Sequence, residues 1–130
     1  MIAHLSRGVL AALFIASGVN HFVSPATYVA IMPPFLPAAA ALVWISGVAE
    51  IAGGLGIVLK ATRRIAGWGL IALLIAVFPA NIYAALHGME LAGRPVPDWM
   101  LWARLPLQAV LVVWVMHAMR TTPDTQRSWN

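Results

Sequence analysis

The sequence predicts an all-α integral membrane protein, an antiparallel four-helix bundle with its N- and C-termini in the cytoplasm. Three observations lead to this prediction: 62% of the 130 residues are apolar, only 9% are charged, and four apolar stretches are long enough to cross a bilayer. A soluble domain has about 45–50% apolar and about 25% charged residues. The composition therefore excludes a soluble enzyme, a disordered chain and a nucleic-acid-binding module, and it makes membrane lipid the expected surroundings.

A membrane span takes about 20 apolar residues at about 1.5 Å per residue. The four predicted spans cover residues 5–23, 38–59, 65–86 and 99–119. The second begins after Pro37, because the missing N–H of proline needs no partner at a helix start, and the third ends before Gly88, a common helix stop. Trp99 and Trp102 are typical of an aromatic belt at the headgroup level. We therefore expect one membrane domain, residues 1–120, and a short polar cytoplasmic tail, residues 121–130.

The basic residues predict the orientation of the bundle. Six of them lie on the side of the termini: Arg7, Lys60, Arg63, Arg64, Arg120 and Arg127. The other side has only Arg94 outside the spans, so the positive-inside rule places both termini in the cytoplasm. Residues 8–19 after Arg7 also fit the apolar region of a signal peptide, but no small-residue cleavage site follows them. The outward loop of residues 24–37 is apolar and rich in proline, so we expect it to lie in the interface or to fold over the bundle mouth as a lid.

Ionisable residues inside spans are the most informative ones, since each costs about 2.5–3.5 kcal/mol at the bilayer centre. Glu50 lies near the middle of the second span and Arg104 in the outer third of the fourth, with Gln108 one turn deeper on the same face. Asn20 and His21 lie at the outer end of the first span.

Asn81 adds a polar group in the outer third of the third span, so all four helices send one toward the outer half of the bundle. Polar groups in lipid face inward and pair, which predicts a shared cavity open toward the outer face. The alternative is that these groups only tie the helices together by hydrogen bonds. Whether Glu50 and Arg104 pair directly stays open, because helix rise separates their depths by roughly 10 Å.

Small residues indicate where the helices approach closely. Gly8, Ala12 and Ala16 form a small-residue ridge on the first span, and three glycines flank Glu50 on the second. The tripeptide Ser-Gly-Val occurs at residues 17–19 and again at 46–48, which is too short to define a repeat.

The chain has no cysteine, so it cannot build a disulfide, a thiolate metal site or an iron–sulfur cluster. Its histidines give no haem site either. His21 and His87 lie near the outer surface and His4 and His117 near the inner one, so no two share a mid-span depth. We expect no metal and no covalently bound cofactor.

Several short motifs resemble those of the DoxX-like small bacterial membrane proteins. They are Gly-Val-Asn-His-Phe (18–22) with Pro25 and Tyr28, Pro33 and Leu36-Pro37, Ser-Gly-Val-Ala-Glu (46–50), Phe-Pro-Ala-Asn (78–81), and Trp102 followed by Arg104-Leu105-Pro106 and Gln108. The resemblance implies a four-helix bundle in the bacterial cytoplasmic (inner) membrane. It also implies a relation to thiosulfate oxidation coupled to quinone, to redox complexes of oxidative stress, or to membrane proteins that bind sterols and other lipophiles. Related disulfide-forming membrane proteins carry cysteines, so that role does not transfer.

Three functions remain open. In the first, the chain is an accessory subunit that binds a quinone or similar lipophile and supports a redox protein partner, since it has no cofactor motif of its own. Arg104, His21 and Asn81 would bind the polar head, with Asn20 and Gln108 in the same cluster. The body would pack on three aromatic residues, Trp44, Phe78 and Trp102.

The second function is an acid–base enzyme, such as an isomerase of a lipophile, with Glu50 as proton donor or acceptor and His21 as the second group. The third is a scaffold subunit of a membrane complex without a ligand. The oligomeric state is left open by the sequence.

Overall fold

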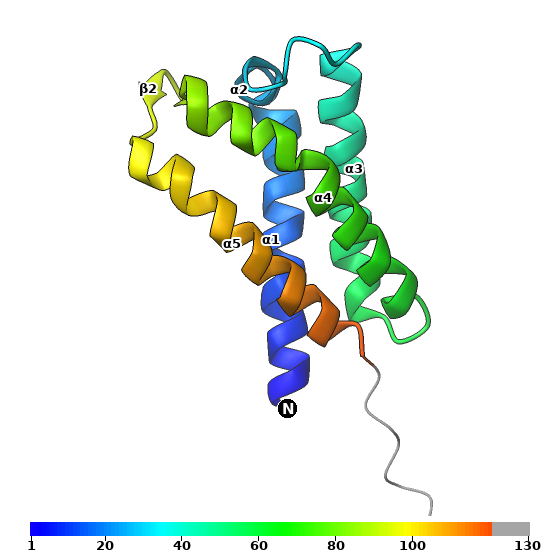
Figure 1. Cartoon of the computed structure of the whole chain (residues 1–130). Coiled ribbons are helices and arrows are strands. Elements are labelled where there is room, and N and C mark those ends of the chain that lie inside the picture. The colour runs from blue at the N-terminus through cyan, green and yellow to red at the C-terminus, as the bar shows by residue number, and fades with distance from the viewer. Residues whose placement is uncertain (121–130) are drawn as a thin grey trace, which may run out of the picture.

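The computed structural model describes residues 1–120, which form four long helices, one short helix and a small hairpin. The elements are α1 (Ile2–Val23), α2 (Pro25–Ala30), α3 (Ala39–Val58), α4 (Arg63–His87), β1 (Glu90–Leu91), β2 (Arg94–Pro95) and α5 (Asp98–Ala118). The long helices run alternately up and down, so both ends of the described chain lie at the same end of the molecule (Figure 1). The predicted tail, residues 121–130, lies outside the described residues.

All four long helices are long and apolar enough to cross a membrane. The prediction of a mostly helical chain with four such helices is therefore confirmed. Each helix overlaps its predicted span, and no end differs by more than three residues.

The two loops at the end opposite the termini have more structure than expected. Between α4 and α5, β1 and β2 form an antiparallel hairpin with Glu90 opposite Pro95. Its turn places both Ala92 and Gly93 at positive φ, the geometry that suits a tight hairpin. The chain before α3 folds back over the ends of α1 and α3, with Ile31 only 4% exposed (Figure 1). We call this the hairpin end of the molecule.

Apolar side chains form two separate clusters inside the bundle. The larger one joins all four long helices nearer the termini, and Leu10, Ile57 and Val115 are fully enclosed in it. The smaller one lies at the hairpin end and joins Ile31 to α4 and to Leu101 of α5. A polar pocket lies on the hairpin side of the larger cluster: Ser17 follows Phe14 by about one turn on α1, and Asn81 follows Leu74 by about two turns on α4.

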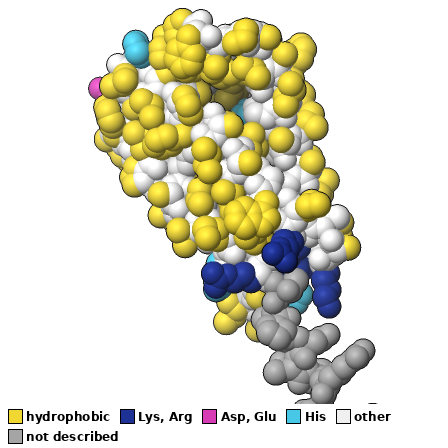
Figure 2. All heavy atoms as spheres, turned by 45° about the vertical axis from the view of Figure 1, so that its right-hand side comes forward, with side chains coloured by type: hydrophobic (Ala, Val, Ile, Leu, Met, Phe, Trp, Pro, Cys, Tyr) yellow, Lys and Arg dark blue, Asp and Glu magenta, His cyan; other side chains and the backbone are white. Residues whose placement is uncertain are grey.

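The outer surface of the bundle is apolar on every long helix. Leu13, Ile45, Ile75 and Val113, one from each, are 50–66% exposed. Figure 2 shows this apolar surface, with Lys and Arg side chains gathered at the end where the termini lie. We call that end the basic end. An apolar surface of this extent marks a face that contacts lipid or other proteins, since soluble monomers avoid it.

Candidate functional site

A polar cavity of about 110 Å³ lies in the hairpin half of the bundle, and Figure 2 shows a hollow in the apolar surface of that half. Its walls come from α1, α2, α3, α4 and α5. The lining residues are Ser17, His21, Tyr28, Ile31, Met32, Val43, Ser46, Glu50, Val77, Ala80, Asn81 and Arg104. The cavity is smaller than the roughly 300–1,000 Å³ of sites for drug-sized ligands, so it has room for a head group rather than for a whole lipid.

The centre of the cavity is a pair of ionisable side chains on neighbouring helices. His21 of α1 and Glu50 of α3 are 6% and 9% exposed, and His21 Nδ1 lies 3.7 Å from Glu50 Oε2. The Ser17 hydroxyl donates to Glu50 Oε1 at 3.3 Å, and the Ser46 hydroxyl lies 3.2 Å from His21 Nδ1. The Ser46 hydroxyl also lies 2.9 Å from the Val43 carbonyl oxygen, to which it donates.

Glu50 Oε2 has no hydrogen-bond partner. Among the buried side-chain nitrogen and oxygen atoms of residues 1–120, it is the only one without a partner. Its separation from His21 fits an ion pair but exceeds a hydrogen bond. A buried polar atom without a partner costs about 1–3 kcal/mol. A hydrogen-bond donor in the cavity would satisfy it.

The opposite wall of the cavity carries amides and a cation. Asn81 of α4 donates to Gln108 Oε1 of α5 at 2.7 Å, and Gln108 donates in turn to the Leu74 carbonyl. Among residues 1–120, the one acceptor of an Arg104 hydrogen bond is the sulfur of Met89, at 3.2 Å. In the described part of the chain, Glu50 is the only carboxylate within 4.0 Å of a basic side chain, and that side chain is His21, so Glu50 and Arg104 do not pair directly.

The close crossing of α1 and α3 positions the His21–Glu50 pair. Gly18 and Gly47 lie at this crossing, where a Cβ on Gly18 would come 2.6 Å from the Gly47 carbonyl oxygen. Side chains larger than hydrogen would force the helices apart. The two Ser-Gly-Val tripeptides are therefore the matching halves of one helix crossing, and each serine bonds a member of the pair.

The cavity gathers most of the polar residues that the sequence indicated. His21, Glu50, Asn81 and Arg104 line it. Gln108 lies behind Asn81 as a buried support. Asn20 does not line the cavity, but it donates to the hydroxyl of Tyr28, which does, at 2.6 Å.

The three aromatic residues expected to pack a ligand lie elsewhere. Trp44, Phe78 and Trp102 are 52%, 39% and 50% exposed on the outside of the bundle, and none lines the cavity. Each of the three lies one or two positions along its helix from a residue that lines the cavity. Positions one or two apart on a helix point in different directions, so these aromatic side chains face away from the cavity. The apolar side chains that do line the cavity are aliphatic or thioether, among them Ile31 and Met32.

Ser17, Ser46 and Tyr28 are site residues that the sequence analysis did not select. A signal was available for the serines, because Ser17 precedes His21 and Ser46 precedes Glu50 by four residues, which is one helical turn. Tyr28 reaches the site from α2, and its ring meets that of His21 edge-on at 4.0 Å. Tyr28 lies outside the four predicted spans, so the periodicity of the spans could not predict its contact with His21.

The comparison with protein families gives one match. The model of a family described as Domain of unknown function (DUF8561) matches residues 10–119. The chain belongs to this family. The match includes every residue that lines the cavity, from Ser17 to Arg104, so the cavity is part of the DUF8561 domain. No curated protein and no solved structure matches the chain.

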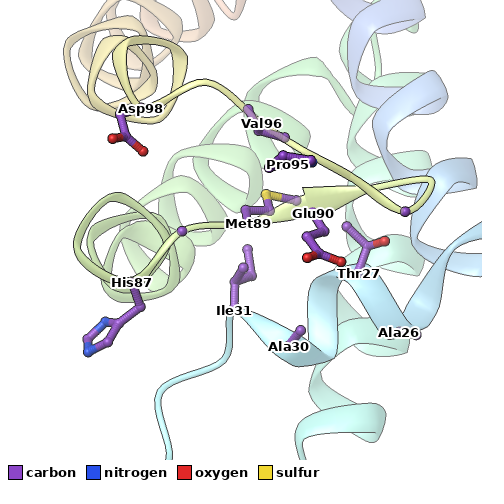
Figure 3. A pocket seen from close by; sticks show the side chains of 12 residues that line it. Ala26, Thr27, Ala30, Ile31, His87, Met89, Glu90, Pro95, Val96 and Asp98 are labelled. Atoms are coloured by element: carbon purple, nitrogen blue, oxygen red, sulfur yellow. The ribbon is translucent and has the colours of Figure 1, made fainter.

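A second cavity of about 540 Å³ opens at the hairpin end, between α2, the hairpin and the start of α5 (Figure 3). Its ionisable residues do not converge: Glu90 lies beside Thr27 of α2, Asp98 lies at the opposite side of the cavity, and the His87 ring points outward (Figure 3). Within residues 1–120, no group of three or more His, Asp or Glu side chains could hold a metal ion. Ile31 lines both cavities, so its side chain is part of the wall between them.

Proposed function

We propose that this DUF8561 protein resides in a membrane and binds the polar head of a quinone-like lipophile in the polar cavity lined by all five helices. The observation that supports this most is Glu50 Oε2, a buried acceptor without a donor, in a cavity whose far wall carries Arg104 without a carboxylate. A quinol hydroxyl would donate to Glu50, and its other oxygen would accept from Arg104. The lipophilic tail would leave between the helices toward the apolar exterior.

The chain would serve a redox protein partner as an accessory subunit in the bacterial inner membrane. It holds no motif for an electron-carrying cofactor, so the electrons would come from that partner. The resemblance of its motifs to DoxX-like proteins supports this assignment, since Asn-His of α1, Glu50 and Arg104 fall on those motifs.

Quinone content of the purified protein tests the proposal. The full chain is extracted in native nanodiscs and its lipophiles are identified by mass spectrometry, for the wild type, Glu50→Gln and Arg104→Ala. Glu90→Gln and Arg94→Ala are matched controls, because they change the same charges at exposed sites outside the polar cavity. We expect a quinone near one per chain in the wild type and both controls, and its loss from both cavity variants. Bulk lipid alone in every sample would contradict quinone binding and leave the polar cluster as structural support or a scaffold feature.

A second function, acid–base catalysis on a lipophile, is favoured by the His21–Glu50 pair. In a double-bond shift, Glu50 would take a proton from an allylic carbon, and the pair would return a proton to the other end of the allyl system. The test is deuterium incorporation into an unsaturated isoprenoid in D₂O. Exchange that disappears in Glu50→Gln while isoprenoid binding persists would support the enzyme; the absence of exchange in the wild type would exclude it for that substrate.

We further propose that both termini lie in the cytoplasm. The test uses the natural lack of cysteine, which makes any introduced thiol unique. A membrane-impermeant maleimide applied to intact cells should label Arg94→Cys at the hairpin, whereas Lys60→Cys between α3 and α4 should react only after lysis. The reverse labelling pattern would show that both termini lie on the outer side of the membrane.

A further inference from the structure

The basic end of the molecule holds two arginines that are fixed in place by helix ends. Arg7 of α1 donates through Nε to the Ala118 carbonyl and through Nη2 to the Arg120 carbonyl, each at 2.9 Å. Arg63 at the start of α4 donates in the same way to the carbonyls of Ile57 and Val58, at 3.1 and 3.0 Å. These carbonyls end α5 and α3, where no amide of the helix can reach them.

Both guanidinium groups keep donors and charge that the described chain does not use. Each makes two bonds out of five N–H donors. Arg7 and Arg63 are 6% and 7% exposed and lie at the same end of the bundle, so their like charges repel each other. The carboxylates of residues 1–120 lie elsewhere: Glu50 is in the polar cavity, and Glu90 and Asp98 are at the hairpin end. A bridging anion would relieve this repulsion.

Further positive charges surround the pair. Lys60, Arg64 and Arg120 are exposed at the same end, where Figure 2 shows the basic side chains gathered in one group. The first turn of α4 also lacks a side-chain cap, which leaves its free N–H groups beside these cations.

The neighbouring surface distinguishes a lipid phosphate from a free one. Leu59 and Ile65, the immediate neighbours of Lys60 and Arg64, are 59% and 80% exposed, and Leu5 beside the Arg7 turn is 69% exposed. The cations therefore stand at the border between the apolar exterior and the polar end. A phosphodiester with acyl chains fits that border, because its charge and its chains would each meet a matching surface.

We propose that the basic end, with Arg7 and Arg63 at its centre and Lys60, Arg64 and Arg120 around them, is a binding site for the phosphate of an anionic phospholipid. The site is separate from the polar cavity and rests only on the proposed residence in a membrane. Lipid bound there would join the ends of α3 and α5 to the start of α4.

The test titrates phosphatidylglycerol into the detergent-solubilised full chain and follows bound lipid by native mass spectrometry. Phosphatidylcholine and inorganic phosphate are parallel probes. The double variant Lys60→Gln, Arg64→Gln changes exposed side chains only, and Arg94→Gln at the hairpin end is its matched control. Since each cation near an anionic lipid contributes about fivefold in affinity, the double variant should raise the Kd for phosphatidylglycerol about 30-fold, and Arg94→Gln should leave it unchanged.

Three outcomes would overturn the proposal. They are equal affinity for phosphatidylcholine and phosphatidylglycerol, an unchanged Kd in the double variant, and saturable inorganic phosphate binding that displaces no lipid. The quinone test uses variants of the polar cavity, and the lipid titration uses variants of the basic end. A failure of either proposal can therefore be told apart from a failure of the other.

Discussion

Replacing Gly18 by alanine is the sharpest test of how α1 and α3 build the polar cavity. The added Cβ would lie 2.6 Å from the Gly47 carbonyl oxygen and 2.8 Å from the Ile51 side chain. Ordinary contacts of a Cβ begin at 3.4 Å, so backbone must move by about 0.8 Å. A carbonyl cannot rotate away as a flexible side chain can, and the helices must separate.

The expected cost follows from two opposing effects. Overpacking a close contact costs about 1–3 kcal/mol. Alanine gains up to about 1 kcal/mol over glycine inside a helix. Gly8, on the same helix, has no atom within 4 Å of the position that an added Cβ would take, so Gly8→Ala should show the helix gain alone. The free energies of unfolding of the two variants should therefore differ by about 1–3 kcal/mol, with Gly18→Ala the less stable.

Thermal unfolding in detergent, followed by circular dichroism, measures this difference. Gly18→Ala should also lose any lipophile bound in the wild type, because Glu50 and His21 lie on the two helices that move apart. Equal stability of Gly18→Ala and Gly8→Ala would refute the close crossing of α1 and α3. Lower stability with full lipophile binding would show that the crossing does not shape the cavity.

Three further substitutions test individual contacts by the same unfolding measurement. Gln108→Leu should lower stability by about 1–3 kcal/mol, because Asn81 and the Leu74 carbonyl each lose a buried partner; unchanged melting would contradict this network. Arg7→Gln should lower the free energy of unfolding by about 1.5–3 kcal/mol, because it removes two hydrogen bonds to carbonyls. An unchanged free energy of unfolding would show that these two bonds do not stabilise the fold. Ala38→Gly should stabilise by about 1 kcal/mol, since Ala38 has a left-handed backbone with φ of 52°, and destabilisation would argue against that conformation.

The sequence predicted the helices because hydrophobicity and length are local properties of the chain. It also selected His21, Glu50, Asn81 and Arg104, since an ionisable or amide side chain in a span is costly wherever its partners lie. What it could not supply was the partner of each group. Depth estimates left a contact between Glu50 and Arg104 open, whereas the structure pairs Glu50 with His21 and joins Arg104 to Met89 of the hairpin connection.

Helix faces account for the expectations that differ from the structure. The expected small-residue ridge was Gly8, Ala12 and Ala16, but all three are exposed, and the close contact is made by Gly18 with Gly47. Trp44 and Trp102 were expected to contact a ligand, yet they lie on the apolar exterior. In an apolar helix every face is hydrophobic, so composition does not tell which face turns inward.

Polar residues provide the missing information, because they define the inward face of an apolar helix. Ser17 and His21 are one turn apart on α1, and Ser46 and Glu50 are one turn apart on α3. Gly18 and Gly47, each next to its serine, lie where these two faces meet. A helix crossing close enough to bring His21 Nδ1 within 3.7 Å of Glu50 leaves room only for hydrogen at both glycine positions. Packing and chemistry therefore depend on the same four-residue spacing, and a substitution that widens the crossing should lengthen the His21–Glu50 contact before it unfolds the bundle.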